Sequence, residues 1–472
     1  MRFNSLEFVI FFAVVFFVLW RFNKRLRTNN IILLVASYAF YGWWDYRFLF
    51  LILASSVVDY VVGYKIPESK NKKAWLSVSL IVNLGLLMFF KYYNFFVESA
   101  NDLMESLGYE GSNNALNIIL PVGISFYTFQ TLSYSLDVYK GKIKPQKDLL
   151  AFLNYVSFFP QLIAGPIERA STFLPQFLKK REFNYDNAII GSRLLLYGFF
   201  KKMVIADNIG LVVDGVYANI QNHSSAELLV AALLFFVQLY CDFSAYTDIA
   251  RGAAKLLGFE LMKNFKTPLF SKSIPEFWTR WHISLTTWFR DYFFIWLAGL
   301  NKKSTLWRIL ATIILFFVIG LWHGANYTFA IFGLLNGIFY IPRILARKNR
   351  VLRNGLKTLN TNPVLSKFAI VFTYLLLSIT GILFRSPDIQ TAGMYYSSML
   401  SFDTMSLSEP VINMIYVSVG ILAYEWIMKE KSHPFEISNF NPILRRSIYV
   451  VLIVLILVVG YFGKEPFYYF QF

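Results

Sequence analysis

Cysteine and charged residues are scarce in this sequence of 472 residues. The single cysteine, Cys241, excludes an internal disulfide and a metal site built from several cysteines. The four histidines are scattered and none belongs to an HExxH motif, so we expect no catalytic metal. Only 15% of the residues are charged, whereas soluble domains carry about 25%. No segment between the apolar runs is large enough to form a soluble domain.

Hydrophobic residues make up 56% of the chain instead, and 19% of the residues are aromatic. Apolar runs recur from one end to the other, which predicts an all-α polytopic integral membrane protein. The formal net charge of +17 does not indicate a nucleic-acid-binding protein, because lysine and arginine gather in the loops between apolar runs. We therefore expect membrane lipid, and no nucleic acid, around the chain.

The charge of the loops predicts how the chain is oriented. Basic loops at 21–27, 65–73 and 140–147 are interrupted by a loop at 98–114 that has acidic residues and no lysine or arginine. Basic loops of membrane proteins face the cytoplasm. Continued through the basic segment 346–357 and the later spans, this alternation places the C-terminal tail outside.

The middle of the chain, 149–299, differs from the rest. Its apolar runs are short, and broken helices at membrane depth are tolerated only where protein or a water-filled cavity covers them. We expect re-entrant and interfacial helices that line a chamber, largely facing the cytoplasm because of the basic pairs at 179–180 and 201–202. The interrupting prolines are Pro160, Pro166, Pro175, Pro268 and Pro275.

One stretch, 313–340, is nearly all apolar and long enough to cross a bilayer, yet it places His323 in its middle. An ionisable side chain in a membrane segment is costly, so it normally faces a polar cavity and functions there. The alternative is a structural histidine that hydrogen-bonds a neighbouring helix. We favour function. Trp322, Asn326 and Asn336 accompany this histidine.

A second histidine, His282, lies in the segment 275–297. If the segment is helical, His282 and Arg290 fall on roughly one face, and Trp278 contributes to an aromatic boundary. The alternative is an amphipathic helix at the headgroup level whose charged residues are solvated or paired. Because His323 is a second histidine within an apolar stretch, we favour a functional site at His282 over this alternative. The charged residues concerned are Arg280, Arg290 and Asp291.

Four ordered motifs resemble the membrane-bound O-acyltransferase family. They are FFPQLIAGPIER (158–169), YCDFSAYTDIARG (240–252), WTRWHISLTTWFRDY (278–292) and GLWHGANYTFAIFGLLNG (320–337). The resemblance covers nearly the full length and is strongest to the bacterial alginate O-acetyltransferase type, with peptidoglycan O-acetyltransferases and the D-alanyl transferase of teichoic acids as relatives. It implies a ring of transmembrane and re-entrant helices around a central chamber. We predict a single domain over 1–472, with N-terminal spans at 1–148, a catalytic core at 149–345 and C-terminal spans at 346–472.

The resemblance also implies roles for residues. The histidine that matches His323 is catalytic in this family, and the one that matches His282 is often required. Transfer of an acyl group from a thioester to a hydroxyl needs a base, which a neutral imidazole can supply. We predict that His323 is this base and that His282 orients the donor or polarises its carbonyl. Further candidate substrate or donor contacts are Trp278, Arg280, Arg290, Asp291, Trp322, Asn326, Asn336, Gln161 and Asp242.

Two of these candidates have a structural alternative. Asp242 begins a polar cluster that extends to Asp248, for which hydrogen bonding in the chamber wall is favoured over a paired-acid hydrolase. Gln161 marks either the turn of a re-entrant segment or a simple helix break.

No bound cofactor is expected, and the resemblance implies acetyl-coenzyme A as the donor substrate. Basic residues could hold its phosphates, although each is equally explained as an ordinary cytoplasmic loop residue. The lysines concerned are Lys255, Lys263, Lys266 and Lys272.

The C-terminal residues Phe467, Tyr469 and Phe472 form F-x-Y-x-x-F. This pattern resembles the C-terminal motif of the small partner peptide in the D-alanyl transfer system, where the tyrosine is proposed to carry the acyl group. Tyr469 is therefore a candidate acyl carrier. An interfacial aromatic anchor is the alternative.

The sequence thus predicts a multi-pass enzyme of the bacterial inner membrane that passes acetyl from cytoplasmic acetyl-coenzyme A towards an exported or cell-wall polysaccharide, with alginate-type exopolysaccharide favoured. An extracytoplasmic serine-hydrolase-like acetyltransferase is the expected partner and contacts the polysaccharide acceptor. Peptidoglycan O-acetylation and D-alanyl transfer are alternatives within this class. A proton-coupled transporter or flippase would need internal repeats and several buried carboxylates, and the sequence indicates neither.

Overall fold

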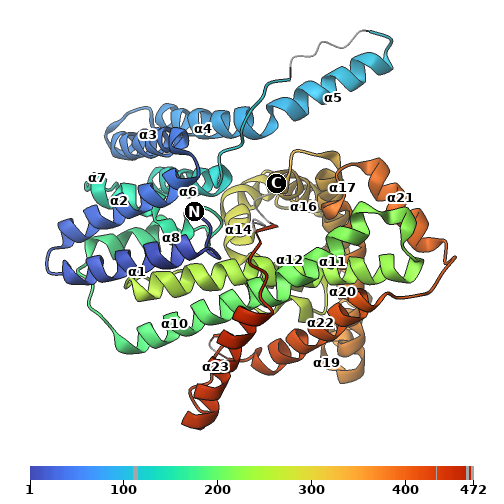
Figure 1. The fold of residues 1–472 in the computed structure, drawn as a ribbon. Coiled ribbons are helices and arrows are strands. Elements are labelled where there is room, and N and C mark those ends of the chain that lie inside the picture. The colour runs from blue at the N-terminus through green and yellow to red at the C-terminus, as the bar shows by residue number, and fades with distance from the viewer. Residues whose placement is uncertain (110–114, 432, 464–466, 469–472) are drawn as a thin grey trace. The chain divides into compact units, whose positions relative to one another are not determined.

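A computed structural model describes residues 1–109, 115–431, 433–463 and 467–468 (Figure 1). Within these ranges all regular elements are helices, and seven helical stretches are long and apolar enough to cross a membrane. The predicted all-α membrane fold is confirmed. The described chain comprises two compact units, 1–191 with 253–262, and 192–252 with 263–472. The single domain over 1–472 stays a prediction.

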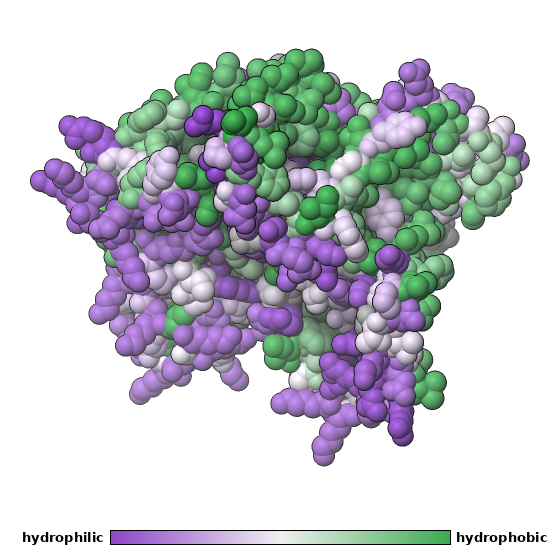
Figure 2. Space-filling view, turned by 90° about the horizontal axis from the view of Figure 1, so that it is seen from below, coloured by the Kyte–Doolittle hydropathy of each residue, from purple (hydrophilic) through white to green (hydrophobic). Residues whose placement is uncertain are grey.

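Many apolar side chains are exposed, as a protein in contact with lipid requires. Phe17, Ile81 and Phe368 have 70%, 71% and 68% of their surface exposed. Figure 2 shows one face on which hydrophobic and hydrophilic side chains gather in separate areas. Such a separation allows one area to face lipid and another to face water.

The first unit holds together around a buried carboxylate. Asp59 on α3 (Leu49–Glu68) accepts a hydrogen bond of 2.6 Å from Asn83 on α4 (Lys72–Leu87). It also accepts hydrogen bonds from Ser79 and from Ser135 on α6 (Ile124–Tyr139). The other helices of this unit are α1 (Leu6–Arg21), α2 (Leu26–Asp45), α5 (Tyr93–Ser106), α7 (Leu149–Ser157), α8 (Phe159–Leu162), α9 (Ala170–Phe173) and the start of α10 (Tyr185–Phe200).

The apolar run 117–138, which the loop charges predict as a crossing from the acidic loop 98–114 to the basic loop 140–147, is helical only in part. Gly123, with a φ of 77°, precedes the first residue of α6, so the helix has 16 residues. At 1.5 Å per residue it measures about 24 Å, less than the roughly 30 Å of a hydrocarbon core.

The second unit contains most of α12 (Ser225–Leu256), an unbroken helix of 32 residues whose part from Ala253 onward belongs to the first unit (Figure 1). The prediction of short, broken helices between 149 and 299 is therefore confirmed only for other parts of this region, such as α7, α8 and α9. The remaining elements of the unit are the π-helical turn η4 (Lys201–Ala206), α11 (Asp207–Ala218), α13 (Ile274–Arg280), α14 (Ile283–Trp288), the π-helical turn η7 (Phe289–Phe294), α15 (Ile295–Gly299), α16 (Thr305–His323), α17 (Tyr327–Phe339), α18 (Ile341–Leu345), α19 (Arg350–Thr361), α20 (Pro363–Arg385), α21 (Ile389–Leu400), α22 (Glu409–Met428) and α23 (Pro442–Val458).

The stretch around His323 is a helical hairpin and not one span. Asn326 caps α17, since its side-chain oxygen accepts a 3.0 Å hydrogen bond from the amide of Thr328. Glycine brings α16 and α17 together: a Cβ atom on Gly320 would lie 2.2 Å from the carbonyl oxygen of Phe329, and one on Gly333 2.3 Å from that of Phe316. The prediction that His323 lies in the middle of a span is wrong, because this histidine ends α16.

Candidate active site

His323 is the last residue of α16 and is 4% exposed. Its imidazole lies 5.1 Å from the ring of Trp322 and 5.2 Å from that of Phe384 on α20, measured between ring centroids. It lines a narrow cavity of about 20 Å³, room for about one water molecule. We call this cavity the histidine pocket; its lining residues are Phe236, Leu239, Phe277, Trp278, Trp281, His323, Phe332, Gly381 and Phe384.

His282 is fully buried at a sharp break between α13 and α14. Its φ of 42° and ψ of 54° are left-handed, a conformation that costs about 1–3 kcal/mol for a residue other than glycine. Hydrogen bonds to Asn264 stabilise this break. The backbone carbonyl of Asn264 accepts a hydrogen bond of 2.9 Å from the amide of Ile283, and its Oδ1 accepts hydrogen bonds of 3.1 and 2.8 Å from the amide and the hydroxyl of Ser284. These contacts divide the segment 275–297 at His282, while Arg290 lies on the π-helical turn η7 that follows α14 directly. The shared face of His282 and Arg290 stays a prediction.

The two histidines face a common tryptophan. The ring centroid of Trp322 lies 5.8 Å from that of His282 and 5.1 Å from that of His323. His282 lies outside the seven candidate spans. Burial lowers its pKa well below the ordinary 6.5, and the neighbouring His323 lowers it further. His282 is therefore neutral at physiological pH.

Several predicted contact residues have structural partners. Nε1 of Trp278 donates to Oδ1 of Asn336 at 3.1 Å, which ties α13 to α17. Nδ2 of Asn326 donates to the carbonyl of Pro387 at 2.6 Å. Arg280 pairs with Glu276 at 2.6 Å.

Apart from Trp278, the predicted contact residues do not line the histidine pocket. Arg290 pairs with Asp291 at 2.7 Å and keeps 60% of its side chain exposed, as in the solvated or paired alternative. Gln161 belongs to the first unit, where its Nε2 donates to the carbonyl of Tyr155 at 3.0 Å.

Asp242 takes part in a buried charge cluster that sequence reasoning missed. Its carboxylate forms an ion pair of 2.6 Å with Nζ of Lys202, and Lys202 also pairs with Asp207 at 2.7 Å. The adjacent Lys201 contacts Asp248 at 2.7 Å. Both lysines are 1% exposed, so they are buried ion-pair partners and not exposed loop residues. The cytoplasmic side predicted for this region stays a prediction. Buried carboxylates, which the sequence did not indicate, are present and paired with lysine.

The end of the described chain reaches the same cluster. The amide of Tyr468 donates to Asp242 at 2.8 Å, and its hydroxyl accepts Nη1 of Arg385 at 3.0 Å. Nζ of Lys202 lies 4.3 Å from the ring centroid of Phe467. The predicted carrier Tyr469 lies outside the described residues.

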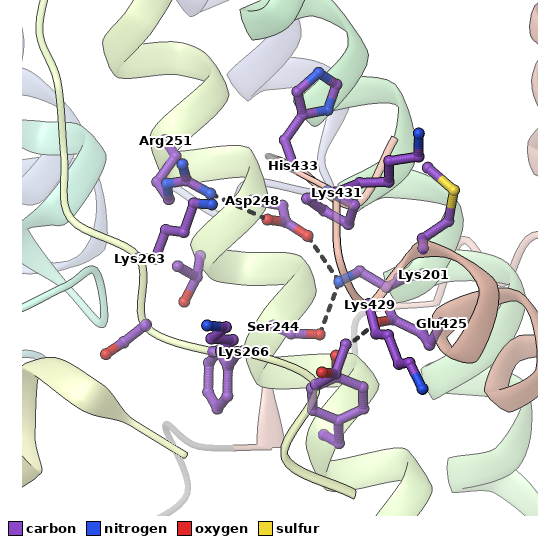
Figure 3. A pocket seen from close by; sticks show the side chains of 17 residues that line it. Lys201, Ser244, Asp248, Arg251, Lys263, Lys266, Glu425, Lys429, Lys431 and His433 are labelled. Atoms are coloured by element: carbon purple, nitrogen blue, oxygen red, sulfur yellow. Dashed lines mark hydrogen bonds and ion pairs between the residues drawn. The ribbon is translucent and has the colours of Figure 1, made fainter. Parts of the chain in front are cut away.

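A cationic cavity of about 260 Å³ adjoins these residues (Figure 3). Lys201 extends into it between Ser244 and Asp248. Six cations and two carboxylates line it: Lys201, Arg251, Lys263, Lys266, Lys429, Lys431, Asp248 and Glu425. Two predicted phosphate partners, Lys263 and Lys266, are among them, whereas Lys255 pairs with Glu260 and Lys272 does not line the cavity.

One tryptophan separates the cationic cavity from the histidine pocket. Trp281 lines the histidine pocket, and its ring centroid lies 5.0 Å from that of Phe265 and 6.4 Å from that of Tyr240. Both of these residues line the cationic cavity. The packed rings of Trp281, Phe265 and Tyr240 therefore lie between the two cavities.

Comparison with known proteins identifies the family of the chain. The sequence pattern of the membrane-bound O-acyltransferase family, MBOAT, matches residues 143–386. The probable alginate O-acetylase AlgI of Pseudomonas aeruginosa is 38% identical over 91% of this chain and 80% of that protein. The protein of the same name from Pseudomonas putida is 39% identical over 87% of this chain and 82% of its own length. The peptidoglycan O-acetyltransferase of Helicobacter pylori is 33% identical over 86% of this chain and 81% of that protein. The chain therefore belongs to the membrane-bound O-acyltransferase family and is a multi-pass membrane enzyme.

Proposed function

We propose that this enzyme passes acetyl from cytoplasmic acetyl-coenzyme A across the bacterial inner membrane for O-acetylation of an exported polysaccharide of the alginate type. Two relatives support this substrate, since both are probable alginate O-acetylases whose similarity covers most of the chain. The relative from Helicobacter pylori makes peptidoglycan the second candidate acceptor.

The proposed orientation follows from the charges at the ends of the hairpin. Lys302, Lys303 and Arg308 lie near the start of α16, and Arg343 in α18 and Arg347 after it follow the end of α17. Basic segments face the cytoplasm. His323 ends α16, 18 residues after its first residue, which is about 27 Å along the helix. This orientation places His323 near the outer face.

The donor is proposed to bind with its phosphates among the lysines of the cationic cavity. Lys263, Lys266 and Lys429 supply positive charge there, and phosphates favour such clusters. The thioester would then reach the histidine pocket past Trp281. Because that pocket is narrow, Trp281 must move when the donor enters.

The proposed chemistry uses each histidine differently. Neutral His323 takes the proton of the acceptor hydroxyl as its oxygen attacks the thioester carbonyl. A C–O bond forms, the C–S bond breaks, and the leaving thiolate takes the proton back from His323. An N–H of neutral His282 donates to the carbonyl oxygen as it gains negative charge.

The observation that carries the proposal is the placement of two buried histidines against Trp322, one tryptophan away from a cavity rich in lysine. The test is release of coenzyme A and acetyl transfer by the purified protein with labelled acetyl-coenzyme A. We expect His323→Ala to lose at least about 100-fold in rate, the usual contribution of a general base. A His323→Ala enzyme with normal transfer would refute the assignment.

Tyr469 is proposed as the first acceptor, from which the extracytoplasmic serine-hydrolase-like partner collects acetyl for the polysaccharide acceptor. The contacts of Phe467 and Tyr468 support this proposal, because they hold the preceding backbone inside the second unit. Tyr469→Phe should abolish a covalent acetyl-protein intermediate, and Tyr468→Phe is the matched control. Polymer acetylation that persists in Tyr469→Phe would reject the carrier.

A further inference from the structure

The connection from the end of α21 to the start of α22, residues 400–408, exposes large apolar side chains (Figure 1). Leu400, Phe402, Met405 and Leu407 have 60%, 63%, 66% and 37% of their surface exposed. Single exposed apolar side chains are common on protein surfaces, whereas a concentration of them marks an interaction site. We call residues 400–408 the apolar segment.

Hydrogen bonds to the start of α12 fix the backbone of the apolar segment. The amide of Ser408 donates to Oε1 of Glu227 at 2.8 Å, and the carbonyl of Ser406 accepts the hydroxyl of Ser224. Glu227 and Ser224 are buried. The exposed apolar side chains therefore belong to a preformed surface.

The conformation of Phe402 also points to a role outside the core. Its φ of 53° lies in the left-handed region, which favours glycine. The ring is nevertheless 63% exposed, so little burial compensates for the strain. Strained residues of this kind cluster at functional sites.

Lipid does not match this surface. Residues 401–408 form no helix, and irregular backbone exposed to lipid does not occur in the hydrocarbon region. The sequence between Arg385 and Lys429 contains no lysine or arginine, while Asp388, Asp403 and Glu409 flank or join the apolar segment. Anionic headgroups attract basic segments and repel acidic ones.

The apolar segment lies close to the residues from which acetyl is proposed to leave. Nδ2 of Asn326, three residues after His323, donates to the carbonyl of Pro387 at 2.6 Å. Arg385 donates to the hydroxyl of Tyr468 at 3.0 Å. From there α21 leads to the apolar segment over 12 residues, about 18 Å, whereas a small folded domain measures about 30 Å. One folded protein can therefore contact both places.

We propose that the apolar segment docks a folded extracytoplasmic protein whose contact surface has an apolar centre and a basic rim. The inference rests on the proposed function, because this protein is the partner that collects acetyl. Phe402 and Met405 belong to the residue types that are enriched at the centre of interfaces. Asp403 and Glu409 complement basic residues of the partner and repel a second copy of this chain.

The first experiment measures whether a protein covers the apolar segment in cells. Met405→Cys is labelled with a small maleimide that does not cross the inner membrane, in intact cells and in purified full-length protein in phosphatidylcholine nanodiscs. Cys241, the native thiol, is buried. The new thiol should react in nanodiscs and be protected in cells. Reaction in both settings would mean no occupant and protection in both would mean lipid or a second copy, and either result would overturn the proposal.

Two variants control this experiment. Asp403→Lys with Thr404→Lys, added to Met405→Cys, places positive charge against the basic rim and should restore labelling in cells. Protection that persists in this variant would overturn the basic partner. Asp102→Cys, at an exposed position of the acidic loop expected outside, should react in both settings and shows that the reagent reaches the outer face.

The second experiment separates docking from folding and from the membrane reaction. Phe402→Gly suits the left-handed backbone, so the purified variant should unfold at the wild-type temperature or above and release coenzyme A at the wild-type rate. Acetylation of the exported polymer should fall, because loss of a central interface aromatic weakens binding roughly 30-fold. Thr404→Ala, an exposed polar neighbour, is the matched control and should change none of these readouts. Wild-type polymer acetylation in Phe402→Gly would overturn the proposal.

The docking surface and the proposed function fail separately. A purified wild type that releases no coenzyme A, with Met405→Cys protected only in cells, would overturn the proposed function and leave the docking surface. Normal release of coenzyme A with equal labelling in cells and nanodiscs would overturn the docking surface alone.

Discussion

Replacement of Asn264 by alanine tests whether the break at His282 serves catalysis. The change removes the Oδ1 that accepts the amide and hydroxyl of Ser284 at 3.1 and 2.8 Å. Ser284 is fully buried, so its amide loses a partner in a region without water, at a cost of about 1–3 kcal/mol. The left-handed conformation of His282 costs a similar amount and persists only while its neighbours enforce it.

We expect the turn in Asn264→Ala to relax and the His282 imidazole to shift. A displacement of about 1 Å at a reacting centre can lower a rate by roughly 100-fold. The assay is steady-state release of coenzyme A, with kcat and KM determined separately, together with thermal unfolding. Because Asn264 also lines the cationic cavity, a donor-binding role would raise KM, whereas a positioning role lowers kcat.

Two variants sharpen this test. Asn264→Asp keeps an oxygen acceptor at the same position and should recover much of the lost kcat. Ser284→Ala removes the hydroxyl but keeps the hydrogen bond from the backbone amide of residue 284 to Asn264, so its effect on kcat should be small. If Asn264→Ala keeps a kcat within twofold of wild type while His282→Ala loses activity, Asn264 does not position the histidine.

Two further predictions concern the same region. Because the pKa of His282 is depressed in the folded protein, only the unfolded state takes up a proton at this residue as the pH falls below 6.5. The free energy of unfolding should therefore be full above that pH and fall by roughly 1.4 kcal/mol by about pH 5.5. Thermal unfolding of His282→Gln should show a smaller loss over this range, and a pH profile identical to that of wild type would contradict the shift. Gly333→Ala should open the hairpin and lower both stability and activity, by about 1–3 kcal/mol in stability, because its Cβ would lie 2.3 Å from the carbonyl oxygen of Phe316. Gly393→Ala in α21, with nothing within 4 Å of its Cβ, is the control and should be neutral or stabilising.

The family and the two histidines could be predicted from sequence because both depend on local features. His323 is prominent as an ionisable residue in an apolar stretch, and the motifs around both histidines are contiguous. The turn after His323 also had a local signal, since Asn326 before an apolar run is typical of a helix start. The high hydrophobicity of the whole stretch obscured it.

The features that sequence reasoning missed depend on distant partners. The break at His282 is enforced by Asn264, 18 residues earlier, through hydrogen bonds that no local pattern encodes. The lysine pair is buried because Asp242 and Asp248 lie 40 and 47 residues later on α12. From sequence alone, two lysines after an apolar run resemble cytoplasmic loop residues, because their carboxylate partners are distant in the chain.

This lysine pair connects the cationic cavity to the described end of the tail. Lys201 and Lys202 are neighbours on the π-helical turn η4, a geometry often found at functional sites. Lys201 lines the cationic cavity, whereas Lys202 holds Asp242, which accepts the amide of Tyr468. Removing one partner of a buried ion pair costs about 3–5 kcal/mol, so each charge holds the other in place. If the donor binds in the cationic cavity as proposed, its anionic groups near Lys201 would act on the same turn that holds the tail, and we expect donor binding and tail position to be linked through η4.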